Sequence, residues 1–159
     1  IRGPQVMAGY WNRPDETARA FTRDGWLRTG DMGYLDAECF LVLTGRASEM
    51  YIRGGYNVYP KEVETEIDEM PGVIESAVIG CPHRDFGEGV TAVVVVKPGA
   101  AITAASIAQT LEQRLAKFKL PKQVFIVDDL PRNTMGKVQK NLLREQYKDI
   151  YAPKGKPGA

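Results

Sequence analysis

Positions 53–60 read RGGYNVYP, and this stretch decides the fold. Two consecutive glycines between β-prone residues indicate a tight hairpin, because glycine adopts the positive φ angles that such turns need. Pro60 stands where the first turn of a helix is expected, since its fixed φ suits that position. The stretch therefore predicts a hairpin that leads directly into a helix.

The sequence after the hairpin alternates between helical and strand-like segments. Val63, Ile67 and Met70 repeat at i, i+4 and i+7, which predicts an amphipathic helix over 60–70. The elements expected next are a strand at 73–79, a strand at 90–96, a helix capped by Thr103 whose apolar stripe runs to Phe118, a strand at 124–127 and a helix at 140–147. This order predicts a small α+β domain over residues 45–151, with a three-stranded core sheet and flanking helices.

The residues before the hairpin form a different kind of segment. Short strands are expected at 25–29 and 40–44. Because so small a β-rich segment cannot bury a core of its own, we expect residues 1–44 to be the C-terminal end of a larger domain. The chain starts at Ile1 without an initiator methionine, which favours the same interpretation. Residues 152–159, rich in Pro, Gly and Lys, are expected to form a loose tail.

Composition and charge narrow the possible functions. No apolar run approaches the roughly 20 residues of a membrane-spanning helix. The two cysteines are far apart and there is a single histidine, so neither a zinc site nor any other metal site is predicted. A disulfide framework is not expected either, which fits a location in the reducing cytoplasm. Residues 1–110 hold 10 Lys/Arg and 15 Asp/Glu (−5), whereas residues 111–159 hold 11 and 5 (+6). A basic C-terminal third suits a nucleic acid, an acidic membrane surface or a phosphorylated small molecule, or is a solvated helix face.

Two candidate functional residues precede the hairpin. Asp31 ends the tripeptide TGD, and one carboxylate can accept hydrogen bonds from the two vicinal hydroxyls of a ribose. An aspartate that caps a turn is the simpler alternative. Arg46 lies where the two segments meet, and its guanidinium can fork onto a ribose or phosphate, or form a surface salt bridge.

Two further candidates follow. Gly54 and Gly55 permit the close approach of a thin ligand such as a pantetheine arm, although a tight hairpin turn is the simpler explanation of the pair. Lys137 ends the polar stretch PRNTMGK at 131–137, between a strand and a helix. It can place a point charge on an oxyanion or be an ordinary surface lysine. The stretch lacks the spacing and the Ser/Thr of a phosphate-binding P-loop.

Together and in this order, the motifs resemble the C-terminal portion of the adenylate-forming superfamily of acyl-CoA synthetases, peptide-synthetase adenylation domains and luciferases. The stretch GWLRTGD at 25–31 is similar to the family's Gly-Trp-x-x-Thr-Gly-Asp motif, and PRNTMGK at 131–137 to its closing lysine motif. GPQVMAGY at 3–10 resembles a strand region of the family, and residues 45–64 resemble its hinge and the following loop.

The resemblance implies a ligase that joins a carboxylic acid to CoA through an acyl-adenylate, using ATP with Mg²⁺. It implies that Asp31 holds the ribose hydroxyls and that Arg46 assists at the ribose or phosphate. Lys137 would stabilise charge on the carboxylate oxygen and the α-phosphate. It also resembles a lysine that is acetylated in some family members, which makes a lysine acetyltransferase an expected partner.

Family enzymes rotate the small domain between their two half-reactions. The rotation would bring Gly54 and Gly55 to the pantetheine path, and the pivot position matches Ser48, where the family usually has Asp or Lys. Lys117, Lys119 and Lys122 are candidates for contacts with CoA. Because the chain lacks the Ser/Thr/Gly-rich phosphate loop of the large domain, we expect it to be inactive alone.

Within the superfamily, residues 55–62, 85–95, 115–122 and 147–151 look most like malonyl-CoA synthetases. The pocket for the acid is expected in the larger domain. Three alternatives stay open: an adenylation domain that loads a carrier protein, a non-catalytic basic binding module, and a truncated regulatory relative. No nucleic-acid motif and no aromatic-interleaved basic stripe is present, so a nucleic acid is not expected as a partner.

Overall fold

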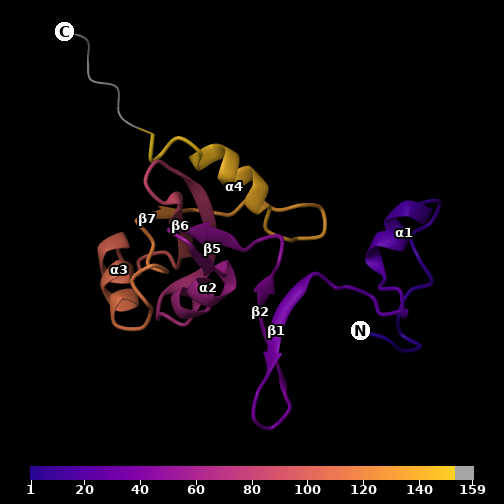
Figure 1. The fold of residues 1–159 in the computed structure, drawn as a ribbon. Helices are drawn as coiled ribbons and strands as arrows, with labels where there is room; N and C mark the ends of the chain where they lie inside the picture. Colours follow the sequence, from indigo (N-terminus) through magenta and orange to yellow (C-terminus); the bar gives the residue numbers. More distant parts are fainter. Residues whose placement is uncertain (153–159) are drawn as a thin grey trace. The chain divides into compact units, whose positions relative to one another are not determined.

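The computed structural model describes residues 1–152, which form two compact units that divide between Ser48 and Glu49 (Figure 1). That residues 1–44 end a larger domain stays a prediction, and the tail predicted at 152–159 lies, but for Ala152, outside the described residues. No helix within residues 1–152 is long and apolar enough to cross a membrane.

The first unit contains helix α1 (Pro14–Ala20) and an antiparallel pair, β1 (Asp31–Leu35) with β2 (Leu41–Arg46). The strand predicted at 25–29 is wrong, because only the isolated bridge between Phe21 and Leu27 forms there. The reason is a tight turn in which Gly25 takes a φ of 82°. None of residues 1–48 is buried, which agrees with the expectation that this segment has no core of its own.

The second unit is the predicted α+β domain. Its elements are β3 (Tyr51–Arg53), β4 (Tyr56–Val58), α2 (Pro60–Asp68), β5 (Val73–His83), β6 (Gly87–Val96), α3 (Ala104–Glu112), β7 (Gln123–Val127) and α4 (Lys140–Tyr147). Strands β5, β6 and β7 are the expected core of the sheet, in which β6 pairs antiparallel with β5 and parallel with β7. The hairpin β3–β4 joins β6 through Arg53 and Gly87, so the sheet has five strands.

Both faces of this sheet are covered. One face packs on Val63 and Ile67 of α2 and on Ile107 and Leu111 of α3, and the other packs on α4. Residues of β6 alternate between these two apolar clusters, so the strand is buried on both sides. Its nearly continuous apolar sequence follows from this position.

Helix α3 begins as predicted but ends earlier. Thr103 and Ser106 form a reciprocal capping box at its start. The helix ends at Glu112, whereas the apolar stripe predicted that it would reach Phe118. Leu115 and Phe118 still pack against the core, because the chain continues in hydrogen-bonded turns. Apolar spacing alone therefore did not reveal the end of the helix.

Candidate active-site residues

The structure brings Asp31 and Arg46 together in the first unit. They lie opposite each other at the open end of the β1–β2 pair, with 3.6 Å between Arg46 Nε and Asp31 Oδ1. Arg46 Nη2 also donates a hydrogen bond to the carbonyl of Thr29 at 2.8 Å. Both side chains stay partly exposed, at 37% for Asp31 and 53% for Arg46. Carboxylate and guanidinium therefore face solvent as a pair that can still accept and donate hydrogen bonds.

Gly30 makes this arrangement possible. Its φ of 79° lies in the left-handed region, and an added Cβ would stand 3.3 Å from Arg46 Nη2. Its carbonyl accepts the backbone N–H of Ala47 at 2.9 Å. The glycine of the TGD tripeptide thus lets the backbone turn beneath the guanidinium. Ser48, the predicted pivot, is the last residue of this unit.

Gly54 and Gly55 form the two-residue turn of the β3–β4 hairpin. Their φ angles are 55° and 87°, as a type I′ turn requires at both central positions. The backbone N–H of Gly54 donates to the carbonyl of Phe86 at 3.0 Å, so the turn is fixed to the start of β6. The predicted hairpin is confirmed.

An aromatic cleft of about 360 Å³ lies beside this turn, lined by Arg53, Gly54, Tyr56, Phe86, Lys117 and Phe118. The rings of Tyr56 and Phe118 stack with their centroids 4.7 Å apart. Sequence reasoning missed these aromatic residues, because nothing local shows that they meet across more than 60 positions.

The three lysines proposed for CoA have different surroundings. Lys117 lines the cleft. Lys119 is engaged in an ion pair with Glu62. Lys122 places its Nζ 4.4 Å from the Phe86 ring centroid and 3.1 Å from His83 Nε2. Lys117 is therefore the best placed of the three to meet a ligand in the cleft.

Lys137 lies on a different loop of the second unit, between β7 and α4. Asn133 organises this loop: its Oδ1 accepts the backbone N–H of Met135 at 3.0 Å and of Lys137 at 2.9 Å. The N–H of Asn133 donates to the carbonyl of Lys137 at 2.9 Å, and Gly136 takes a φ of 77°. The backbone of Lys137 is thus held at both its N–H and its C=O.

The side chain of Lys137 is free of such constraints. The residue is exposed, and within residues 1–152 its ammonium group forms no ion pair. A cation on a fixed backbone, with no carboxylate neutralising it, is suited to an incoming anion.

Comparison with known proteins identifies a domain in this chain. Residues 62–137 match the AMP-binding enzyme C-terminal domain, and Lys137 is the last matched residue. This chain carries an AMP-binding enzyme C-terminal domain. The predicted likeness to the C-terminal portion of adenylate-forming enzymes is thereby confirmed. The structure of ATP-bound MatB from Rhodopseudomonas palustris is similar, with 59% sequence identity and a TM-score of 0.85 over 94% of this chain.

Two curated relatives of this AMP-binding enzyme domain are CoA ligases. One, from Rhodococcus jostii (strain RHA1), is named for a methyl-dioxo-octahydroindenyl propanoyl group and is 49% identical over 148 residues, or 93% of this chain. An indoleacetate–CoA ligase of Aromatoleum aromaticum is 47% identical over 145 residues, or 91% of this chain. The chain spans 29% and 28% of these two proteins and 30% of the MatB chain.

Proposed function

We propose that this chain is the C-terminal part of an ATP-dependent acyl-CoA ligase. In the first half-reaction a carboxylate attacks the α-phosphate of ATP, giving acyl-AMP and pyrophosphate. In the second, the CoA thiol attacks the acyl carbon, giving acyl-CoA and AMP. The observation that carries the proposal is Lys137, a cation that forms no ion pair within residues 1–152 and stands on an ordered loop at the end of the matched domain.

Lys137 would act in adenylation. Negative charge accumulates on the carboxylate oxygen and the α-phosphate as the new P–O bond forms, and a positioned ammonium group stabilises it. The Asn133 hydrogen bonds support this role, because they fix the backbone from which the long side chain extends. Replacing Lys137 removes the charge but leaves these backbone contacts in place.

Asp31 and Arg46 would hold the nucleotide. A carboxylate with two oxygens can accept both ribose hydroxyls, and the neighbouring guanidinium can donate to the ribose or the α-phosphate. Their partial exposure and their 3.6 Å separation support this assignment. Among residues 1–152 no group of three or more His, Cys, Asp or Glu side chains is arranged to hold a metal ion. Mg²⁺ would therefore accompany ATP, held mainly by residues outside this chain.

The Gly54–Gly55 turn and its cleft would serve the second half-reaction. Glycines leave room for the narrow pantetheine arm, whereas stacked rings beside a lysine suit a base with nearby phosphates. The second unit would present Lys137 and this turn in sequence by rotating about Ser48, so that one domain serves both half-reactions. Acetylation of Lys137, which would remove the charge needed for adenylation, stays a prediction.

Malonate is the acid we propose. Support comes from the four sequence stretches that look like malonyl-CoA synthetases and from the 59% identity with MatB. The relatives named above are called after different acids although they are 49% and 47% identical to this chain over the aligned residues. The acid would therefore be selected in the large domain.

The test is AMP formation by the full-length protein with ATP, CoA and a panel of acids that includes malonate, indoleacetate and a long-chain fatty acid. We expect acid-dependent AMP, with malonate preferred. Preference for another acid would agree with the ligase assignment but contradict malonate as the substrate. Absence of acid-dependent AMP formation would contradict the proposed function. The chain of residues 1–159 alone is expected to release no pyrophosphate, and release would contradict the assignment of the phosphate site to another domain.

A further inference from the structure

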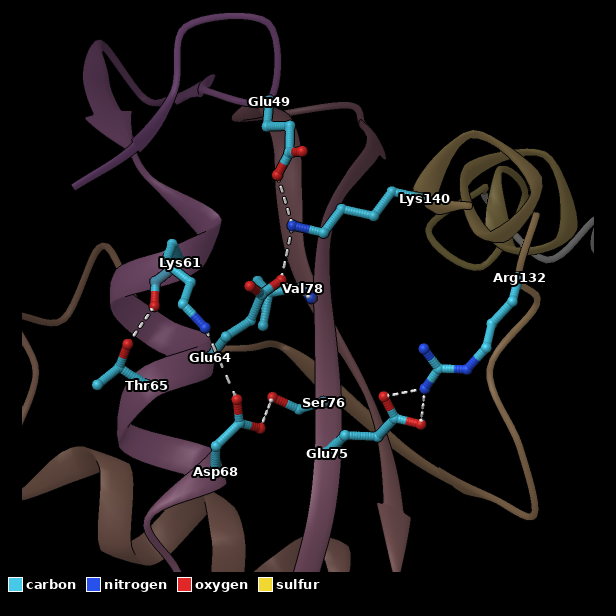
Figure 2. A network of polar contacts seen from close by, with 10 residues as sticks. All are labelled: Glu49, Lys61, Glu64, Thr65, Asp68, Glu75, Ser76, Val78, Arg132 and Lys140. Atoms are coloured by element: carbon cyan, nitrogen blue, oxygen red, sulfur yellow. Dashed lines mark hydrogen bonds and ion pairs between the residues drawn. The ribbon is translucent and has the colours of Figure 1, made fainter. Parts of the chain in front are cut away.

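Arg132 connects the Lys137 loop to the central sheet. Its Nη1 donates a hydrogen bond to the carbonyl of Gly136 at 2.7 Å, directly before Lys137. Its Nη2 contacts both carboxylate oxygens of Glu75 on β5 (Figure 2). One guanidinium thus joins Gly136, the residue before the candidate catalytic lysine, to Glu75, which lies 57 positions before Arg132 in the sequence.

The course of β5 explains why Glu75 lies within reach. Glu75 shares a face with Ala77, which packs in the cluster beside α4, whereas Ser76 points the other way and donates to Asp68 of α2 at 2.7 Å. The pairing of β5 with β6 is irregular between Val73 and Glu75. This bulge lets Val73 join the opposite apolar cluster while Glu75 stays on the face of the Lys137 loop.

The chemistry of the contact requires arginine. A guanidinium has five donors in a plane, so it can bind a carboxylate and a carbonyl at the same time. A lysine at this position could reach one of these partners with a compact charge but could not hold both in a fixed geometry. The hydrogen bonds of Asn133 and the bridge between Arg132 and Val138 set the local shape of the loop, and Val138 packs against the apolar cluster beside α4. Arg132 adds a polar contact to the sheet from within the loop.

We propose that Arg132, oriented by Glu75, is a positioning residue that fixes the direction in which Lys137 leaves the loop. This inference rests on the proposed function, because it assigns a partner to the lysine that acts in adenylation. All three residues belong to the second unit, so the contact moves with Lys137 when that unit rotates. Arg132 therefore matters only while Lys137 is in the active site.

This dependence distinguishes positioning from plain stabilisation. Lys137 acts in the first half-reaction and not in the second, so a loosened loop slows adenylation and leaves thioester formation from acyl-AMP unchanged. A merely structural arginine would lower both rates together through a smaller folded fraction. The separation of the two half-reactions is therefore the informative readout.

The experiment measures both half-reactions in the full-length enzyme, using malonate or whichever acid of the panel supports AMP formation. Adenylation is followed by acid-dependent ATP–pyrophosphate exchange and thioester formation by CoA consumption from the matching acyl-AMP. The variants are Arg132→Lys, Glu75→Gln and Lys137→Ala. The control is Arg114→Lys, which alters another exposed arginine–glutamate pair, with Glu66, away from the loop.

We expect Arg132→Lys and Glu75→Gln to slow adenylation tenfold or more and to leave the thioester step within twofold, with Arg114→Lys unchanged in both. In the Lys137→Ala background, Arg132→Lys should cause no further loss. Normal adenylation in Arg132→Lys, equal losses in both half-reactions, or additive losses in the double variant would overturn the inference. If Lys137→Ala itself leaves adenylation intact, the proposed role of Lys137 fails together with this inference. The proposed function fails only if the unaltered protein forms no acid-dependent AMP, so the two failures can be told apart.

Discussion

Lys140 places its Nζ between two carboxylates, 2.7 Å from Glu64 and 2.6 Å from Glu49 (Figure 2). Glu64 is almost fully buried in α2, and its Oε1 also accepts the backbone N–H of Val78 on β5 at 2.8 Å. The three charged groups thereby tie α4 to α2, to the sheet and to the residue that follows the predicted pivot Ser48.

Breaking this cluster should weaken the fold. Lys140→Met leaves the Glu64 carboxylate buried without its cation, and we expect the free energy of unfolding to fall by about 3 kcal/mol. Urea denaturation followed by circular dichroism measures this. Lys148→Met is the control, because Lys148 pairs with Glu145 on the open surface and its replacement should leave the free energy of unfolding nearly unchanged. Equal losses in the two variants would show that the buried cluster contributes nothing special.

Tyr51 should make the fold sensitive to high pH. Burial raises the pKa of its phenol well above the usual value of about 10, and the Glu88 carboxylate raises it further. The unfolded chain loses this proton near pH 10, whereas the folded chain keeps it. The contribution to stability is therefore complete below that pH and declines by up to about 1.4 kcal/mol per pH unit above it.

Tyr51→Phe tests this linkage. In the described part of the chain the Tyr51 hydroxyl has no hydrogen-bond partner, so at pH 7 the variant should be as stable as the parent or slightly more so. Between about pH 10 and 11 the free energy of unfolding should decline less steeply in the variant than in the parent. Parallel slopes in urea titrations at both pH values would contradict the assigned pKa shift.

In the Gly54–Gly55 turn, the effect of backbone strain on stability can be measured separately from the effect of ligand access on the thioester step. In Gly55→Ala the added Cβ has no atom within 4 Å, so the only strain comes from the φ of 87°. We expect the free energy of unfolding to fall by about 1 kcal/mol. Gly99→Ala is a matched control, with a φ of 77°, equally open surroundings and no place in the aromatic cleft. We expect similar losses of stability in both variants but a slower thioester step only in Gly55→Ala. Equal thioester rates would remove this turn from the proposed pantetheine path.

Local sequence signals predicted most of the fold. The helix at 140–147, the Thr103 cap, the glycine hairpin and the apolar strand at 90–96 depend on spacing and on residue type at single positions. The strand predicted at 25–29 failed because a glycine turn leaves it only one bridge. The end of α3 was misplaced because successive turns keep the same face buried.

The candidate site was less accessible to sequence reasoning. Asp31, Arg46 and Lys137 stand in recognisable motifs, so the sequence alone suggests them as candidates. The Glu75–Arg132 contact and the stacking of Tyr56 on Phe118 join residues about 60 positions apart. Such pairs depend on strand register and on how helices cover the sheet, which no short window of sequence contains.

Acid-dependent AMP formation by the full-length protein and its Lys137→Ala variant tests the central claim most directly. The matched control is Lys97→Ala, another exposed lysine that forms no ion pair within residues 1–152. The account predicts that adenylation falls at least 100-fold, by about 3 kcal/mol in transition-state stabilisation, in Lys137→Ala and is unchanged in Lys97→Ala. Undiminished AMP formation in a folded Lys137→Ala protein would contradict it.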